Sequence, residues 1–534
     1  MKKAIVIMMA VMVFLTGCQK AAEQTKAELT PAGEFPISKE KAVIKVFAGK
    51  YPGVEDLDTN KFTQKYEEKT NVHIEWEQVP YEQIKEKANI ILSSGDYPDV
   101  FMGAQITNSQ LVSYGEQGIF LPLNDLIENN SKYFKELLEK EAWIKDQITT
   151  PNGKIYTFPM AHENYHMQYP YKFWMYKPWL TELGLEVPTT TDELYTVLKA
   201  FKERDPNKNG KADEIPLAGS KGSTAIDIFL MNSFVYNDGS LLQNNDGTLE
   251  FISSTEGYRN GLRYLTKLYK EGLIAPESFT MDNTQLRQMG ENPDVVILGA
   301  APALYYGDFT QDNGASGRYL DYVPVAPLKG PDGVQYAATY PYSIGNHMQI
   351  TNKCADPELV MRWVDWLYTS EAKMELTFGY EGEHWKKADA GQVGLNDKPA
   401  VFQLIKKIND QQQNETIRDT VPNHGPMSMI EGMYIEDREN YTEYKLINTT
   451  RDFYDPYRYK MPAYSPYYTS EQATEVAQVS APIGNFVTSS LAKFVTGEMD
   501  IETDWDSYVA ELEKMNVKRF VQIQQEAYDA KNKK

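Results

Sequence analysis

Side chains that carry oxygen recur at alternate positions in a short loop before the middle of the chain. Asp205, Asn207 and Asn209 are followed by Gly210 and then by Asp213. Oxygen ligands at every second position, followed by a glycine that permits a sharp turn, are typical of the first half of a calcium-binding loop. The spacing therefore predicts a Ca²⁺ site within residues 205–216.

The second half of this loop departs from the usual calcium-binding pattern. The main-chain carbonyl of Lys211 is the expected ligand before Asp213, but the twelfth position is Pro216 instead of a bidentate glutamate. Glu214 then has to supply the closing carboxylate from two residues earlier. The alternative is a solvated turn rich in Asp and Asn that binds no ion.

A second metal-binding pattern lies at His162-Glu163-Asn164-Tyr165-His166, which matches H-E-x-x-H. On a helix, this spacing places two imidazoles on one face for zinc and a glutamate beside a zinc-bound water. Pro159 and Pro170 bracket the segment, and its aromatic neighbours favour extended chain. We expect loop residues beside a cleft, and keep a zinc protease with a downstream glutamate as third ligand as the alternative.

The N-terminus predicts export and lipid attachment. Lys2 and Lys3 precede an apolar run over residues 4–15, and Leu15-Thr16-Gly17-Cys18 is similar to a bacterial lipobox. Residues 1–17 are the expected signal peptide, and a lipidated Cys18 would hold the mature chain on the outer face of the cell membrane. An ordinary signal peptide with a chance cysteine is the alternative. Residues 18–40 are polar and predict a flexible tether.

Composition excludes several classes of protein. The formal charge of −21 and the pI of about 4.9 leave no basic stripe for nucleic acid. Once Cys18 carries the lipid, Cys354 is the second and last cysteine, so the mature chain forms no internal disulfide. With 42% hydrophobic residues, the chain can bury large cores. We expect a soluble, monomeric body.

The first part of the body alternates strands and helices. Strands are predicted at residues 42–47, 72–79 and 99–102, and helices around residues 60–69 and 81–92. This order is typical of a parallel sheet covered by helices, in which ligands meet the carboxyl ends of the strands.

Motifs spread along the chain resemble one family. They occur in the same order as in large lipoprotein solute-binding proteins of ABC importers, in the group that handles oligosaccharides and includes alginate-binding proteins. The matching stretches are Trp174–Leu180, Leu183–Leu185, Val187–Thr190, Ala200–Lys202, the 205–216 loop, Val325–Gly333 and Gly379–Trp385.

The resemblance implies an α/β fold with two lobes, of the periplasmic-binding-protein type, with parallel-type sheets and a hinge. We expect an N-terminal lobe from residues 41–160 and 345–405, and a C-terminal lobe from residues 161–344 and 406–534. The resemblance also implies a structural Ca²⁺, held by residues matching Asp205, Asn207, Asn209, Lys211, Asp213 and Glu214.

A sugar presents apolar C–H faces and hydroxyl edges, so its site combines aromatic rings with hydrogen-bonding groups. Candidates near strand ends and loops are Tyr305, Tyr306 and Trp385 as rings and Glu381 as acceptor, with Trp174 and Tyr340 as further rings. We expect an oligosaccharide ligand, delivery to the membrane subunits of an ABC permease, and no catalysis. A peptide-binding importer component and a surface glycosidase or zinc protease are the alternatives.

Overall fold

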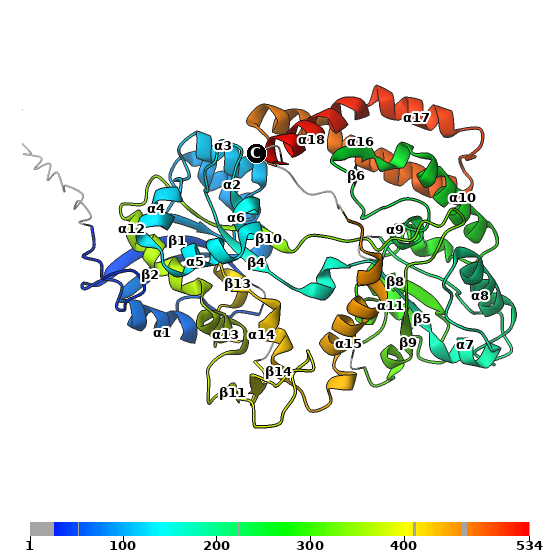
Figure 1. Ribbon diagram of the computed structural model, residues 1–534, viewed down its shortest axis with the longest axis horizontal. Helices are drawn as coiled ribbons and strands as arrows, with labels where there is room; N and C mark the ends of the chain where they lie inside the picture. The colour runs from blue at the N-terminus through cyan, green and yellow to red at the C-terminus, as the bar shows by residue number, and fades with distance from the viewer. Residues whose placement is uncertain are drawn as a thin grey trace, which may run out of the picture.

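The computed structural model describes residues 26–51, 53–221, 224–312, 314–408, 413–460 and 467–532. The expected signal peptide and Cys18 lie outside these ranges. Within them, no helix combines the length and the apolar character needed to cross a bilayer. Figure 1 shows two lobes side by side, joined by several extended segments.

The first lobe is built on a six-stranded sheet in the order β13-β4-β10-β3-β1-β2. Its strands are β1 (Ala42–Lys50), β2 (Val72–Pro80), β3 (Val100–Met102), β4 (Phe158–His162), β10 (Ser343–Ile350) and β13 (His424–Gly425). The first strand pairs in parallel with β2 and β3, as the alternation of strands and helices predicts. In contrast, β10 runs antiparallel to β3 and β4.

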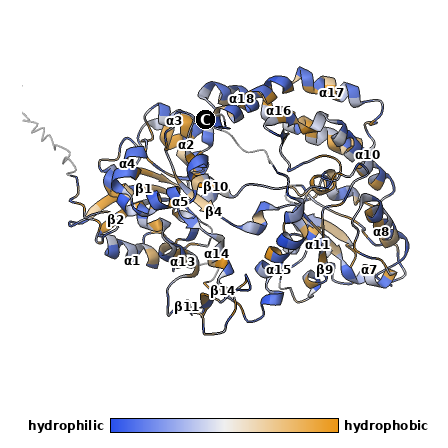
Figure 2. Ribbon diagram, in the orientation of Figure 1, coloured by the Kyte–Doolittle hydropathy of each residue, from blue (hydrophilic) through white to orange (hydrophobic). Residues whose placement is uncertain are grey.

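Alternate residues of the central strands pack into two separate hydrophobic cores. Ile44 and Val46 belong to one apolar cluster, and Phe47 belongs to another. Because successive side chains of a strand point to opposite faces, both faces of the sheet are buried. The covering helices are α1 (Lys61–Thr70), α2 (Ile84–Ser94), α3 (Asn108–Glu116), α4 (Asn124–Asn130), α5 (Tyr133–Lys140), α6 (Ala142–Ile148), α12 (Pro357–Asp365) and α13 (Ser370–Phe378). Figure 2 shows the apolar residues gathered on the strands and on the inward sides of these helices.

The second lobe has a smaller sheet in the order β8-β5-β9, from Ala300–Ala303, Lys172–Tyr176 and Tyr322–Val325. All of its pairings are antiparallel, which differs from the expected parallel-type sheet. Helices surround it: α7 (Lys177–Leu183), α8 (Thr191–Glu203), α9 (Ile226–Met231), α10 (Glu256–Lys270), α11 (Asn283–Gly290), α15 (Thr442–Thr449), α16 (Ser470–Thr496), α17 (Trp505–Lys514) and α18 (Val517–Asn532). The last two helices, α17 and α18, are separated at Asn516, whose φ is 65°.

Two smaller elements complete the chain. A hairpin of β6 (Leu242–Asn245) and β7 (Thr248–Phe251) packs beside α18. An extension formed by β11 (Trp385–Lys387), β12 (Phe402–Leu404), α14 (Met427–Glu431) and β14 (Met433–Tyr434) lies below the first lobe in Figure 1. Phe402 of this extension shares a small core with Ile447 of α15, so the extension touches both parts of the molecule.

The described parts of the chain require two corrections to the expected domain boundaries. Residues 26–40 are not a free tether, because Ile37 is buried in the first core and the Ala27 N–H donates to Asp356. Residues 413–425 belong to the first lobe instead of the second. Ile417 lies in the first core. His424 belongs to β13, which pairs with β4 as the edge strand of the first sheet.

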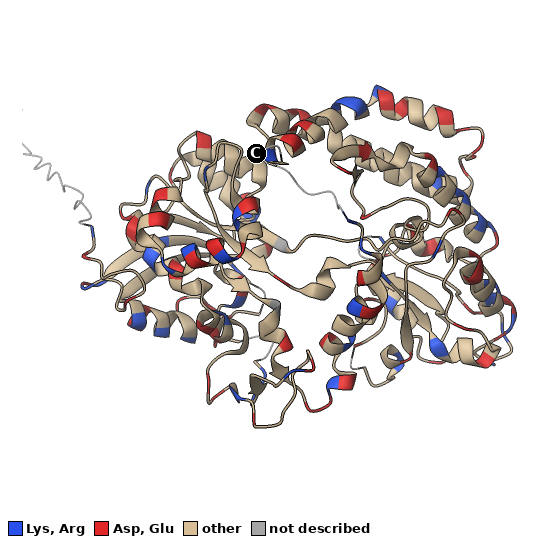
Figure 3. Ribbon diagram, in the orientation of Figure 1, with Lys and Arg blue, Asp and Glu red and all other residues tan. Residues whose placement is uncertain are grey.

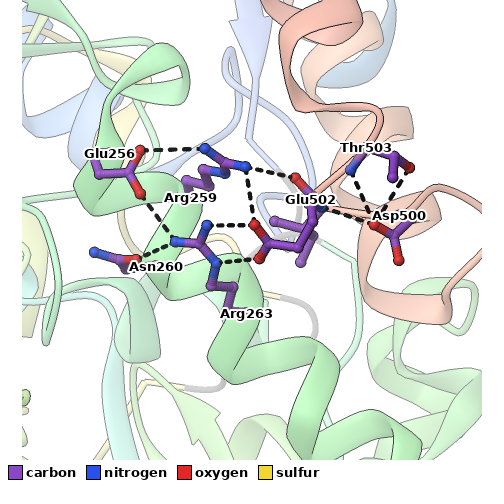
Figure 4. Close-up of polar contacts among 8 residues, drawn as sticks. Glu256, Arg259, Asn260, Arg263, Asp500, Glu502 and Thr503 are labelled. Carbon is purple, nitrogen blue, oxygen red and sulfur yellow. Dashed lines mark hydrogen bonds and ion pairs between the residues drawn. The ribbon is translucent and has the colours of Figure 1, made fainter.

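Exposed ion pairs join the turn after α16 to α10 (Figure 4). Arg263 donates to Glu502 at 2.6 Å and to Glu256 at 3.0 Å. Arg259 also reaches Glu502, at 3.1 Å. Each exposed pair adds little stability on its own, but together they hold the turn between α16 and α17 against α10. Figure 3 shows charged residues mostly on the outer helices and few on the segments that join the lobes.

Candidate ligand-binding cleft

The chain passes between the lobes at residues 163–171, 326–342 and 426–441. A cavity of about 900 Å³ lies beside the first two of these crossings. This volume is at the upper end of the range for ligand sites, about 300–1,000 Å³. Its described lining consists of Asn108, Trp143, Asp146, Gln147, Ile148, His162, Asn164, Met167, Gln168, Pro170, Tyr171, Tyr340, Pro341, Tyr342, Ile344, Asn346, Tyr467, Lys531 and Asn532.

Two pairs of aromatic rings stand in the lining of the cleft. Trp143 of α6 and Tyr342 have ring centroids 5.5 Å apart, and Tyr171 and Tyr340 have centroids 6.3 Å apart. Tyr340 is held in place by a hydrogen bond from its hydroxyl to the carbonyl of Asp238. The pair of Trp143 and Tyr342 lies on the side of the first lobe, and the pair of Tyr171 and Tyr340 lies beside β5. Each lobe therefore presents aromatic rings to a ligand between them.

Amide side chains of the cleft are positioned by hydrogen bonds to the backbone and to each other. Asn346 donates from Nδ2 to Asn108 Oδ1 at 2.7 Å and to the Ile106 carbonyl at 3.2 Å. Gln168 donates to the Tyr340 carbonyl at 3.3 Å and accepts from Arg458. Pre-positioned amides beside aromatic rings are suited to the hydroxyl edges of a sugar.

The H-E-x-x-H residues lie at the first crossing and do not form one helix. His162 ends β4, whereas His166 lies in a short 3₁₀ turn over residues 165–168. Glu163 contacts His424 at 2.9 Å, and His166 faces Glu443 of α15 at 3.2 Å. Glu163 and His166 therefore have partners from different parts of the molecule, and neither His162 nor His166 belongs to a metal-capable group among the described residues. His162 and Asn164 do line the cleft, as expected for loop residues beside it.

Of the six residues expected to contact ligand, Tyr340 lines this cleft. Trp174 and Tyr306 are core residues of the second lobe, 2% and 1% exposed, and their rings pack edge to face. Tyr305 is half-buried against the same core. Glu381 and Trp385 belong to the extension, where the Trp385 indole donates to the Gly379 carbonyl. The structure places these five outside the described lining.

The predicted calcium loop has the expected turn and a connected set of oxygen donors. Gly210 has a φ of 72°, and its N–H donates to Asp205. Asn207 and Asn209 both donate from their amides to Asp213, at 2.9 Å.

Glu214 provides the test of whether the loop suits a cation. One of its carboxylate oxygens is buried and has no hydrogen-bond partner. Burial raises the pKa of Glu214, and the nearby carboxylates of Asp205 and Asp213 act in the same direction. A divalent cation would relieve both the desolvation and the crowding of like charges, so the residues fit Ca²⁺.

A different acidic group lies under the first lobe, among the described residues. Glu383, His384 and Glu415 have ligand atoms within 4.8 Å of one another. Lys61 already lies 2.8 Å from Glu383 and 3.1 Å from Glu415. The Tyr380 N–H donates to His384 Nδ1, which leaves the proton of a neutral imidazole on Nε2. We therefore interpret this group as a cluster of ion pairs around Lys61.

Comparison with known families decides the class of the protein. The sequence profile described as "Bacterial extracellular solute-binding protein" matches residues 52–374, which is more than half of the chain. The chain belongs to this family. The two-lobed α/β fold predicted from the resemblance is confirmed by solved structures of such solute-binding proteins.

Among relatives of this solute-binding protein is the fructooligosaccharide ABC transporter substrate-binding protein FusA of Streptococcus pneumoniae. The two are 27% identical over 551 residues, which cover 99% of this chain and 97% of FusA. The polygalacturonan/rhamnogalacturonan-binding protein YtcQ of Bacillus subtilis is 24% identical, over 72% of this chain and 74% of YtcQ. A solved structure of a FusA EF-hand mutant with fructo-nystose has a TM-score of 0.73 and 25% identity, covering 91% of this chain and 99% of that one.

Proposed function

We propose that this solute-binding protein captures an oligosaccharide in the cleft between its lobes and delivers it, chemically unchanged, to the permease of an ABC importer. The observation that carries the proposal is the pair of aromatic platforms, Trp143 with Tyr342 and Tyr171 with Tyr340, on either side of one cavity. Ring faces of this kind suit the C–H faces of sugars better than the varied side chains of peptides. The names of the FusA and YtcQ relatives support the same class of ligand.

Binding would favour the closed arrangement of the lobes. A ligand that contacts both pairs of rings gains its full contact surface only when the lobes come together, so it shifts the population toward that state. The segments 163–171 and 326–342 join the lobes beside the cavity and would carry this motion. The closed monomer is then the form that the permease receives.

Titration calorimetry with a panel of oligosaccharides tests the proposed function. We expect at least one sugar to bind with heat and to raise the melting temperature, and chromatography to recover it intact after incubation. Mixed peptides serve as the comparison class. Absence of heat and of any thermal shift with every sugar would reject the proposal, and conversion of the sugar to product would assign an enzyme instead.

We also propose that Cys18 anchors the protein on the outer face of the cell membrane, on the basis of the Leu15-Thr16-Gly17-Cys18 sequence. In a Cys18→Ser variant, we expect the protein to leave the membrane fraction and to appear in the medium or to retain its leader, because two or more acyl chains give the stable attachment. Fractionation of cells with an antibody measures this. Retention of the variant with membranes would contradict the anchor.

The 205–214 loop is proposed to hold a structural Ca²⁺, with oxygen ligands from the six residues named for it above. The partnerless oxygen of Glu214 supports this assignment, as does the EF-hand named for the FusA relative. The Ile215 N–H donates to the Ile297 carbonyl at 2.7 Å, and the Gly299 N–H donates to the Ile215 carbonyl. Because these bonds tie the loop to the segment that leads into β8, the ion would stabilise the second lobe and not contact the sugar.

A further inference from the structure

The charge of the cleft identifies the kind of sugar that it suits. Apart from tyrosines, three described lining residues have side chains that titrate, namely Asp146, His162 and Lys531, and no arginine is among them. The remaining polar lining is made of asparagine and glutamine amides. The net charge of the described lining therefore depends on the protonation states of these three groups.

The charges of these three groups sum to about zero near neutral pH, within the described lining. Burial, and next the nearby Lys373 ammonium, lower the pKa of His162 to about 4, so its imidazole is neutral. Lys531, near the end of α18, interacts electrostatically with Asp146 of α6. This cation and this carboxylate come from the two sides of the cleft and compensate each other.

An acidic sugar would lose hydration in this cleft without gaining a matched partner. Recognition of a carboxylate generally uses arginine, whose planar group donates two parallel hydrogen bonds, or an unpaired lysine. The one lysine of the described lining has Asp146 as a counter-charge, and that carboxylate would repel a uronate. Neutral hydroxyls meet no such cost, because a hydroxyl can both donate to and accept from uncharged polar groups.

We propose that the cleft selects uncharged oligosaccharides and discriminates against chains of uronic acids. The inference rests on the proposed function and deepens it, because it chooses between the neutral and the acidic sugars named for the two relatives.

Calorimetry with matched sugars tests the selection. The ligands are fructo-, malto- and galacto-oligosaccharides, and oligogalacturonates and oligoalginates of the same chain lengths. We expect at least one neutral series to bind. We expect every uronate series to bind at least about 100-fold more weakly than this neutral series. A uronate that binds as tightly as the best neutral sugar would overturn the selection and leave the proposed function intact. Failure of both classes would instead reject the proposed function.

An Asp146→Asn variant tests the cause of the selection. Removing the carboxylate takes away its repulsion of a uronate and its attraction for Lys531, so we expect the affinity for uronates to rise by about tenfold relative to the affinity for neutral sugars. The additional variant Asp146→Asn/Lys531→Met should return uronate binding to the wild-type level. Asp125→Asn, on α4 outside the lining, is the matched control and should change neither affinity. An unchanged uronate affinity in Asp146→Asn would overturn the assigned role of this pair.

Discussion

Replacing Trp143 with alanine is expected to weaken binding of the captured oligosaccharide by about 30-fold or more. The indole is half-buried on α6 and stands beside the Tyr342 ring in the wall of the cleft. Truncation of a central aromatic anchor typically costs about 2 kcal/mol or more, and each 1.4 kcal/mol is about a factor of ten in affinity. Calorimetry with the best sugar measures the change.

Trp385→Ala is the matched control for Trp143→Ala. Trp385 is also a half-buried tryptophan, but it lies in the extension, packed on Phe402, and not in the cleft lining. We expect its loss to leave sugar affinity within about twofold. Thermal melts of both variants verify that each is folded. If Trp385→Ala abolished binding and Trp143→Ala did not, the ligand would lie against the extension and the assigned cleft would be wrong.

Removal of Ca²⁺ is expected to lower the melting temperature of the second lobe by about 5–10 °C. An ion present at 100 times its dissociation constant stabilises the folded state by about 2.7 kcal/mol, and each kcal/mol corresponds to about 2–4 °C for a unit of this size. The physical source is the buried, partnerless oxygen of Glu214 beside two other carboxylates. Calorimetry or fluorescence melts with EGTA, and with Ca²⁺ restored, measure the shift.

A Glu214→Gln variant isolates the ion from the rest of the loop. Because the substitution keeps the shape but removes the closing charge, the variant should lose most of its response to added Ca²⁺. Asp332→Asn, in an exposed turn away from the loop, should respond as the wild type does. Identical melts of the wild type with and without chelator would show that residues 205–214 form a solvated turn, and would remove the metal from the proposal.

Local patterns in the sequence predicted the parts of the molecule that depend on neighbouring residues. The turn at Gly210 and the oxygen-bearing side chains of the predicted calcium loop follow from spacing over ten residues. The parallel pairing of β1 with β2 and β3 likewise follows from the alternation of strands with helices. Family resemblance then supplied the two-lobed arrangement, which the short motifs alone do not determine.

The lining of the cleft depends on contacts between residues far apart in the sequence. Trp143 lies in a short helix whose sequence has no feature that separates a cleft ring from a core ring. Trp174 and Tyr306 illustrate the opposite case, because aromatic residues near strand ends suggested a platform but pack into the second core. Tyr171 and Asn164 lie in the stretch rich in aromatics and prolines, and that composition was the one local signal that extended chain runs beside a cleft.

The sheet of the first lobe takes strands from residues 42 to 425, with the β5-β8-β9 sheet of the second lobe inserted between β4 and β10. During synthesis, the emerging polypeptide therefore lacks β10 until about two-thirds of its length has been made, and β13 until about four-fifths. Pairings of such long sequence separation form slowly, and the unpaired edges of β3 and β4 are open to aggregation until they do. A nascent chain that stops short of residue 425 has no complete first sheet, so this sheet is completed only after most of the chain has been made.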